Sequence, residues 1–165
     1  MRPRIAWLVI VAILIAACGA LPPRPAPVLT APPVPAVPPG TQTNAGAAIV
    51  RIAASLVGTR YEFGGADEAG FDCSGLVHYV HEHAGLAIPR TAAAQQRAAL
   101  AVPLAQLQPG DLVFFSRDGQ LIDHVGIYAG FGRFIHAPHA GVAVSYAELT
   151  SAYYARHLVS AGRFW

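Results

Sequence analysis

The chain has 165 residues, two cysteines and a formal net charge of +2 when its histidines are neutral, which leaves room for one modest domain. Its positive charges are arginines scattered along the chain. The sequence lacks the run of basic residues with interleaved aromatic side chains that is typical of proteins that bind single-stranded nucleic acid. Composition and charge therefore argue against a nucleic-acid partner.

Residues 1–17 predict a secretory signal. Arg2 and Arg4 precede an uninterrupted apolar run from Ile5 to Ala17. This run is roughly a dozen residues long, whereas a helix that spans a bilayer needs about 20. The length therefore favours a cleaved signal over a permanent transmembrane anchor.

The end of this segment, Ile15-Ala16-Ala17-Cys18, resembles the lipobox of bacterial lipoproteins. The resemblance implies that Cys18 is lipidated and becomes the first residue of the mature protein. Several acyl chains give lasting attachment, because each buried methylene contributes about 0.8 kcal/mol. Gly19 follows instead of the aspartate that retains lipoproteins in the inner membrane. The resemblance therefore implies a lipid anchor in the outer membrane, with the domain facing the periplasm.

Residues 18–45 are predicted to be a linker, because most of the 14 prolines lie in the stretch 21–43 and proline at this density prevents regular packing. Polyproline II rises about 3.1 Å per residue, so the linker would hold a domain about 60–70 Å from the membrane. The domain itself is expected to cover residues 46–165.

Three helices are expected in the first half of this domain. The first buries an apolar stripe and ends at Gly58, the second covers residues 73–84, and the third lies within residues 88–100. Their predicted N-caps, in chain order, are Asn44, Asp72 and Thr91. Between the first two helices, residues 59–72 are rich in glycine and are expected to form a loop.

Strands are expected in the second half. They are predicted at residues 112–116, 121–128, 133–137 and 141–145, and the last stretch, 156–165, is expected to return as an edge strand. Helices followed by strands predict an α+β fold in which N-terminal helices pack on a C-terminal antiparallel sheet.

Cys73 has no partner for an intramolecular disulfide if lipid consumes Cys18. It stands at the start of the second helix, where the helix dipole and free amides favour a thiolate and lower the pKa of a cysteine. A buried, inert cysteine is the alternative.

A nucleophilic cysteine needs a base and a group that orients this base. His124 and His136 lie on two consecutive predicted strands, and they share a face only if the strands pair in an even register. A three-residue loop with a glycine bulge at Gly130 and Gly132 meets this condition, whereas a two-residue loop would place the histidines on opposite faces.

Several motifs occur in the order known from one family. They are Tyr61-Glu62-Phe63-Gly64-Gly65, Asp72-Cys73-Ser74-Gly75, the stretch from Asp123 to Tyr128, and Phe134-Ile135-His136-Ala137. Together they resemble the NlpC-type cell-wall endopeptidases, a papain-like family of cysteine peptidases, over essentially the whole domain. Phe63 stands where many relatives have tryptophan.

The resemblance implies a role for each matching residue. Cys73 would attack a peptide carbonyl, His124 would shuttle the proton, and His136 would orient the imidazole of His124. The backbone N–H of Cys73 and the Tyr61 hydroxyl would stabilise the oxyanion. Two residues, Asp72 and Ser74, would lie beside the peptide stem of the substrate.

The predicted function is hydrolysis of peptide bonds in peptidoglycan by a monomer without a cofactor. The resemblance leaves two bonds open, the bond after γ-D-glutamate and the D,D cross-link, and favours the cross-link for a single-domain lipoprotein. Two other functions stay open: a non-catalytic lipoprotein that binds peptidoglycan, and a thiol acyltransferase on the same fold.

A zinc site near the end of the second helix is the less favoured alternative. His81 and His83 flank Glu82, but this spacing is not the HExxH pattern that directs two histidines to one helical face. A solvated helix face is expected here, and no metal.

Overall fold

The computed structural model describes residues 39–165, with side chains from residue 45 onward. Within this range the chain forms α-helices at Pro39–Ser55 (α1), Cys73–His83 (α2), Ala92–Ala98 (α3) and Ala152–His157 (α4), and a 3-10 turn at Leu104–Gln106. Strands cover Ala66–Asp67 (β1), Gly70–Phe71 (β2), Leu100–Val102 (β3), Leu112–Phe115 (β4), His124–Gly130 (β5), Arg133–His136 (β6), Ser145–Glu148 (β7) and Leu158–Arg163 (β8).

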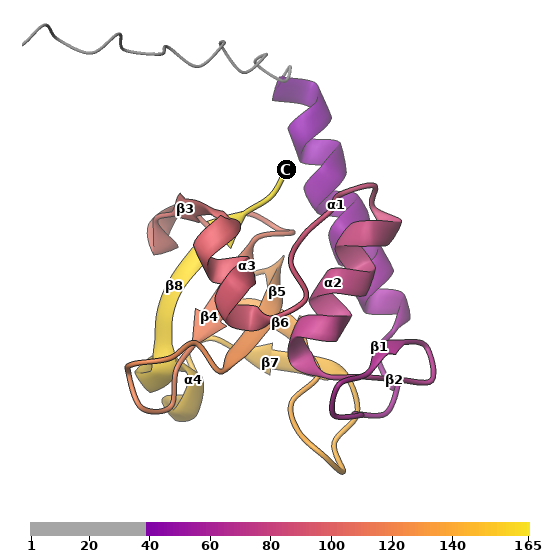
Figure 1. Ribbon diagram of the computed structural model, residues 1–165. Coiled ribbons are helices and arrows are strands. Elements are labelled where there is room, and N and C mark those ends of the chain that lie inside the picture. Colours follow the sequence, from indigo (N-terminus) through magenta and orange to yellow (C-terminus); the bar gives the residue numbers. More distant parts are fainter. Residues whose placement is uncertain (1–38) are drawn as a thin grey trace, which may run out of the picture. The chain divides into compact units, whose positions relative to one another are not determined.

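The main sheet has six strands in the order β3-β8-β4-β5-β6-β7, and all its neighbouring pairs are antiparallel. The helices α1 and α2 lie side by side and pack on this sheet (Figure 1). The predicted α+β architecture, with N-terminal helices on a C-terminal antiparallel sheet, is confirmed. None of the helices in residues 39–165 is long and apolar enough to cross a membrane.

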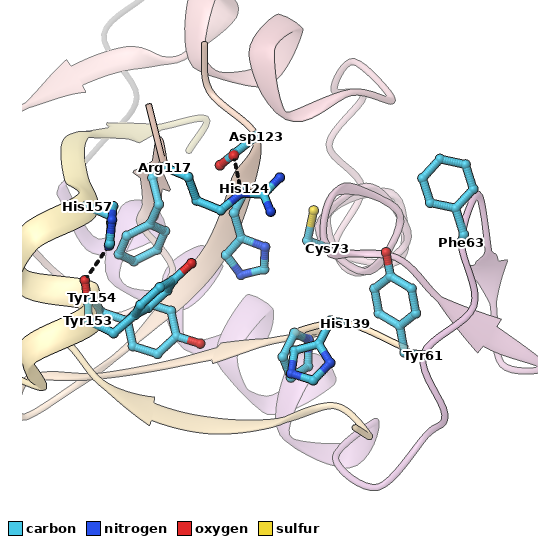
Figure 2. A pocket seen from close by; sticks show the side chains of 12 residues that line it. Tyr61, Phe63, Cys73, Arg117, Asp123, His124, His139, Tyr153, Tyr154 and His157 are labelled. Carbon is cyan, nitrogen blue, oxygen red and sulfur yellow. Dashed lines mark hydrogen bonds and ion pairs between the residues drawn. The ribbon is translucent and has the colours of Figure 1, made fainter. Parts of the chain in front are cut away.

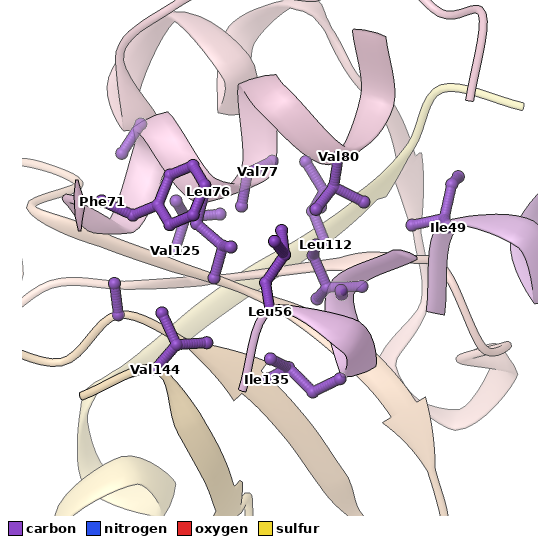
Figure 3. Packing of buried hydrophobic residues seen from close by; sticks show 14 of the residues in the cluster. Ile49, Leu56, Phe71, Leu76, Val77, Val80, Leu112, Val125, Ile135 and Val144 are labelled. Carbon is purple, nitrogen blue, oxygen red and sulfur yellow. The ribbon is translucent and has the colours of Figure 1, made fainter. Parts of the chain in front are cut away.

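The main core lies between the two helices and the sheet. Figure 3 shows Ile49 of α1, Val80 of α2 and Leu112 of β4 in this core, and all three side chains are fully buried. Burial of one such side chain contributes about 1.5–3 kcal/mol. The core therefore fixes the helix that carries Cys73 against the strand that carries His124.

Strand β4 is buried on both of its faces. Leu112 and Phe114 belong to the main core, whereas Val113 and Phe115 belong to a second cluster on the other face, which also includes Phe134. This double burial explains why the strand reads as a continuous apolar run rather than an alternating one.

The first helix begins earlier than predicted. It starts at Pro39, so Asn44 lies inside the helix and is not its N-cap. Proline suits the first helical position, because its missing N–H would have no partner there. The rest of the predicted linker, the signal segment and Cys18 lie outside the described residues.

The other two predicted caps have different outcomes. Asp72 caps α2 as expected, since its Oδ1 accepts a hydrogen bond from the Gly75 amide at 2.6 Å. Thr91 occupies the N-cap position of α3, but its side chain makes no capping hydrogen bond.

The predicted edge position of the last strand is wrong. Strand β8 lies between β4 and β3, and β3, a strand that was not predicted, forms the edge directly after the stretch expected to hold the third helix. Gly162 permits this pairing, because a Cβ at this position would lie 2.5 Å from the Ala99 Cβ.

Further short elements were not predicted. Helix α4 lies between β7 and β8, and β1 and β2 form a small hairpin in the stretch expected to be a loop. Strand β7 begins at Ser145 instead of residue 141, because Gly141 adopts a φ of 85° in a turn.

The hairpin between β5 and β6 satisfies the register condition in an unexpected way. Its turn has two residues, Phe131 and Gly132, with φ of 53° and 74°, which is typical of a tight primed turn. Tyr128 pairs with Phe134 and Gly130 with Arg133, so Ala129 is an extra, bulged residue. The bulge restores the even register, and the two histidines share a face.

His81 generates a prediction about acid stability. It is fully buried, its Nδ1 lies 2.8 Å from the Val77 carbonyl, and its Nε2 has no hydrogen-bond partner among residues 39–165. Burial lowers the pKa of His81 to about 4. Between pH 6.5 and 4 the imidazole of His81 is therefore protonated in the unfolded chain but not in the folded one. The wild type should therefore lose about 3 kcal/mol of unfolding free energy through this residue as the pH falls over that range.

The test is urea unfolding of His81→Leu between pH 7 and pH 4. The variant should match the wild type within about 1 kcal/mol at pH 7, because leucine has a similar volume, and it should lose less stability in acid. The control is His83→Leu, which changes an exposed histidine of the same helix. An unaltered acid slope in His81→Leu would contradict the prediction.

Candidate active site

A cavity of about 760 Å³ opens where the start of α2 faces the start of β5 and the helix α4 (Figure 2). Its lining residues are Tyr61, Phe63, Cys73, Phe115, Arg117, Asp123, His124, Pro138, His139, Tyr153, Tyr154 and His157. Cys73 and His124, the predicted nucleophile and base, thus line one cavity.

Cys73 is the first residue of α2, and a polar network fixes this end of the helix. The Arg90 guanidinium donates to both carboxylate oxygens of Asp72, at 2.9 and 2.8 Å. It also donates to the Gly65 carbonyl at 3.1 Å. A Cβ at Gly75 would lie 2.0 Å from that carbonyl oxygen, so only glycine allows the loop to pack this closely on the helix.

The thiol of Cys73 is held in its protonated form. Burial and, second, the negative charge of Asp72 raise its pKa above the ordinary value of a cysteine. The backbone amides of Val125, Ser74 and Cys73 itself act in the opposite direction. The expectation that the helix start lowers this pKa is therefore wrong, because desolvation outweighs the amides.

His124 and His136 form a hydrogen-bonded pair. The Nε2 of His124 lies 2.8 Å from the Nδ1 of His136. Burial lowers the pKa of His124 to about 4 and that of His136 to about 3, and the neighbouring His124 lowers the latter further. Both imidazoles are therefore neutral at pH 7, and His124 is ready to accept a proton.

Gly126 makes room for this pair. It lies on the same face of β5 as His124, and a Cβ at this position would lie 2.4 Å from the Phe134 ring. Phe134 thus fills the space that a side chain at 126 would occupy, and its ring packs 4.8 Å from that of His136.

Tyr61 reaches the same cavity from the segment before α2 (Figure 2). Burial raises the pKa of its hydroxyl, and the negative charge of Asp72, together with that of Cys73 once it is ionised, adds to this effect. The Glu62 amide donates to the Phe71 carbonyl at 2.9 Å, which anchors the backbone beside Tyr61. The hydroxyl is therefore protonated and available as a donor.

Asp72 and Ser74 lie in the network that caps α2 and do not line the cavity. The Ser74 hydroxyl donates to the Asp72 Oδ1 at 3.2 Å and accepts from Arg90 at 3.0 Å. The structure thus gives both residues a structural role, and their contact with substrate stays a prediction.

The wall formed by α4 was missed from the sequence. It contributes Tyr153, Tyr154 and His157 to the cavity. The sequence signal for this wall was the aromatic cluster after Ser151, because serine is a residue type that often stands at the start of a helix. Opposite this wall, the nearly fully exposed ring of Phe63 forms part of the rim.

No group of three or more His, Cys, Asp or Glu side chains in residues 39–165 could hold a metal ion. The histidines near the end of α2 point to different partners. His81 is buried beside Val77, and His83 is exposed and stacks on Tyr79 at 3.9 Å.

Comparisons with known proteins match the same part of the chain. The model of the NlpC/P60 family matches residues 58–163. The bifunctional muramidase/DL-endopeptidase CwlT of Bacillus subtilis (strain 168) is 42% identical over 118 residues, 70% of this chain and 35% of that protein. The murein DD-endopeptidase MepH of Escherichia coli (strain K12) is 41% identical over 112 residues, 65% of this chain and 41% of that protein.

A solved structure agrees with these matches. The crystal structure of an NlpC/P60 family protein from Bacillus cereus ATCC 10987 superposes with a TM-score of 0.70 at 34% identity, over 72% of this chain and 40% of that one. The chain spans less than half the length of each of these three proteins.

The raised pKa of Cys73 predicts slow alkylation at neutral pH. Because iodoacetamide reacts with the thiolate, the rate should rise about tenfold per pH unit from pH 7 to pH 9. Mass spectrometry of the Cys73 peptide measures this rate, with free cysteine as the reference. A rate that is already at its plateau at pH 7 would contradict the raised pKa.

The Arg90 network predicts a large difference between two arginine substitutions. Arg90→Lys loses the two-pronged contact with Asp72, which is only 14% exposed, and should cost about 1–3 kcal/mol of unfolding free energy. Arg60→Lys is the control, since its ion pair with Glu62 is exposed and should be worth less than about 1 kcal/mol. Equal losses in urea unfolding would show that the network does not stabilise α2.

Proposed function

The chain belongs to the NlpC/P60 family, and we propose that it is a cysteine-type endopeptidase that hydrolyses peptide bonds in peptidoglycan. The observation that carries this proposal is the cavity shared by Cys73 and His124, with His136 hydrogen-bonded behind His124 at 2.8 Å. These are a nucleophile, a base and a group that orients the base.

The neutral resting state determines the order of proton transfers. The Nδ1 of His124 takes the thiol proton as Sγ attacks the substrate carbonyl carbon, so the thiolate forms only when it is used. The imidazolium then gives this proton to the leaving amine, and the C–N bond breaks to leave a thioester. His124 then takes a proton from a water molecule, whose oxygen attacks the thioester carbonyl. The C–S bond breaks, the acid is released, and the proton returns from His124 to the Cys73 thiolate.

Two donors stabilise the charge that develops on the carbonyl oxygen. The backbone N–H of Cys73 is at the open start of α2, and the Tyr61 hydroxyl enters the cavity from the other side. Removal of one such donor typically lowers the rate by about a hundredfold or more.

The bond we propose is the D,D cross-link between stem peptides. The names of the two curated relatives include a DL-endopeptidase and a DD-endopeptidase, so members of the family differ in the bond that they cleave. The proposal of the cross-link rests on the lipoprotein layout of residues 1–18.

The cellular setting is part of the same proposal. Lipid on Cys18 would anchor a monomer to the outer membrane, and residues 19–38 would separate the domain from the bilayer. Peptidoglycan lies in the periplasm on this side of the membrane, so the anchor would bring the cavity to its substrate.

The test is digestion of purified peptidoglycan by the full chain in detergent, followed by mass spectrometry of the released fragments. The wild type should release fragments, and their masses name the bond. Cys73→Ala should reduce release to background, and His124→Ala should lower the rate about a hundredfold or more.

The product masses also separate the alternative functions. Release of free acids indicates hydrolysis, whereas transfer to an added amine would indicate an acyltransferase. Binding of peptidoglycan without release, by a chain that unfolds cooperatively in urea, would contradict the proposal and indicate a non-catalytic lipoprotein.

A further inference from the structure

The orienting residue His136 has a second polar neighbour besides His124, the hydroxyl of Tyr154. His136 is only 2% exposed, and both of its ring nitrogens have contacts. Its Nδ1 lies 2.8 Å from the His124 Nε2, and its Nε2 lies 3.4 Å from the Tyr154 hydroxyl oxygen. Among the described residues, Tyr154 is the only hydrogen-bond partner of that Nε2.

The direction of the first hydrogen bond decides whether His124 can act as a base. The mechanism needs a free lone pair on the His124 Nδ1, so the proton of this neutral ring must sit on Nε2. His136 must then accept this proton through an unprotonated Nδ1. Its own proton is consequently on Nε2, the nitrogen that faces Tyr154.

The other tautomer of His136 would prevent His124 from acting as a base. A proton on the His136 Nδ1 would be donated to the His124 Nε2, and His124 would then carry its proton on Nδ1, toward the nucleophile. The two tautomers of a free imidazole differ little in energy, so a hydrogen bond at one nitrogen decides between them.

Tyr154 is placed rigidly enough to make this choice. Its ring packs edge-on against His136 at 5.3 Å, Phe134 at 4.9 Å and Phe115 at 5.3 Å. These contacts come from two strands of the sheet, whereas Tyr154 comes from α4. Burial raises the pKa of its hydroxyl, so the group is neutral and its oxygen can accept.

We propose that Tyr154 is a positioning residue: its hydroxyl oxygen accepts the Nε2–H of His136 and so holds both histidines in the tautomers that leave the His124 Nδ1 free to accept the thiol proton. This inference rests on the proposed function for its catalytic consequence. Its structural half, the tautomer of His136, does not depend on which substrate the protein cleaves.

The first test is ¹⁵N NMR of histidine-labelled full chain in detergent at pH 7.5. The signals of His136 are identified by their loss in His136→Gln, and they should show a single tautomer with the proton on Nε2. Tyr154→Phe removes the hydroxyl and keeps the ring packing, and it should give a mixture of both tautomers. The matched control is Tyr153→Phe, the same change at the adjacent residue, which should leave the His136 tautomer as in the wild type.

The second test is the rate of peptidoglycan cleavage. Tyr154→Phe should lower kcat about three- to tenfold, as expected for loss of one neutral hydrogen bond, and change KM less than twofold. Tyr146→Phe, on an exposed part of β7 outside the cavity, should leave both constants unchanged.

The outcomes separate this inference from the proposed function. A single Nε2–H tautomer that persists in Tyr154→Phe overturns the inference, whatever happens to the rate. A mixed tautomer with an unchanged kcat overturns the catalytic half. If the wild type releases no fragments, the proposed function fails, and the NMR result still decides whether Tyr154 sets the tautomer.

Discussion

The hydrogen bond between His124 and His136 depends on one extra residue in the sheet. Ala129 bulges from β5 and restores the even register that the two-residue turn at Phe131 would otherwise destroy. Without the bulge every side chain of β6 would change faces, and His136 would enter the main core instead of the cavity. The geometry of the site is therefore a property of the hairpin, set at the far end of β5 from His124.

Burial connects the fold to the chemistry. The same packing that fixes α2 on the sheet removes water from Cys73 and from both histidines, and each group consequently stays uncharged at neutral pH. A neutral thiol and a neutral imidazole avoid the large cost of an isolated buried charge. The charged groups nearby are paired: Asp72 with Arg90 behind the nucleophile, and Asp123 with Arg117 at the cavity.

The sequence predicted what depends on local patterns. The α2 helix follows from the spacing of its apolar residues and from Asp72, and the pairing of His124 with His136 follows from strand periodicity together with glycines at 130 and 132. The place of β8 inside the sheet did not follow, because it depends on β3, three residues whose strand state comes only from their long-range partner. The state of the Cys73 thiol was also missed, since desolvation arises from tertiary packing that the motif does not contain.

Helix α4 is the least stable of the elements that form the site. It has only six residues, none of them buried, and its N-cap Ser151 makes no capping hydrogen bond. A helix this short has little stability of its own, so it should open at a free energy well below that of the sheet, whose central strand β4 is buried on both faces. In the folded state this wall is held by side-chain packing, through the ring of Tyr154 against Phe115, Phe134 and His136. If α4 opens, the Tyr154 hydroxyl leaves the Nε2 of His136, while β5, the strand that carries His124, stays in place.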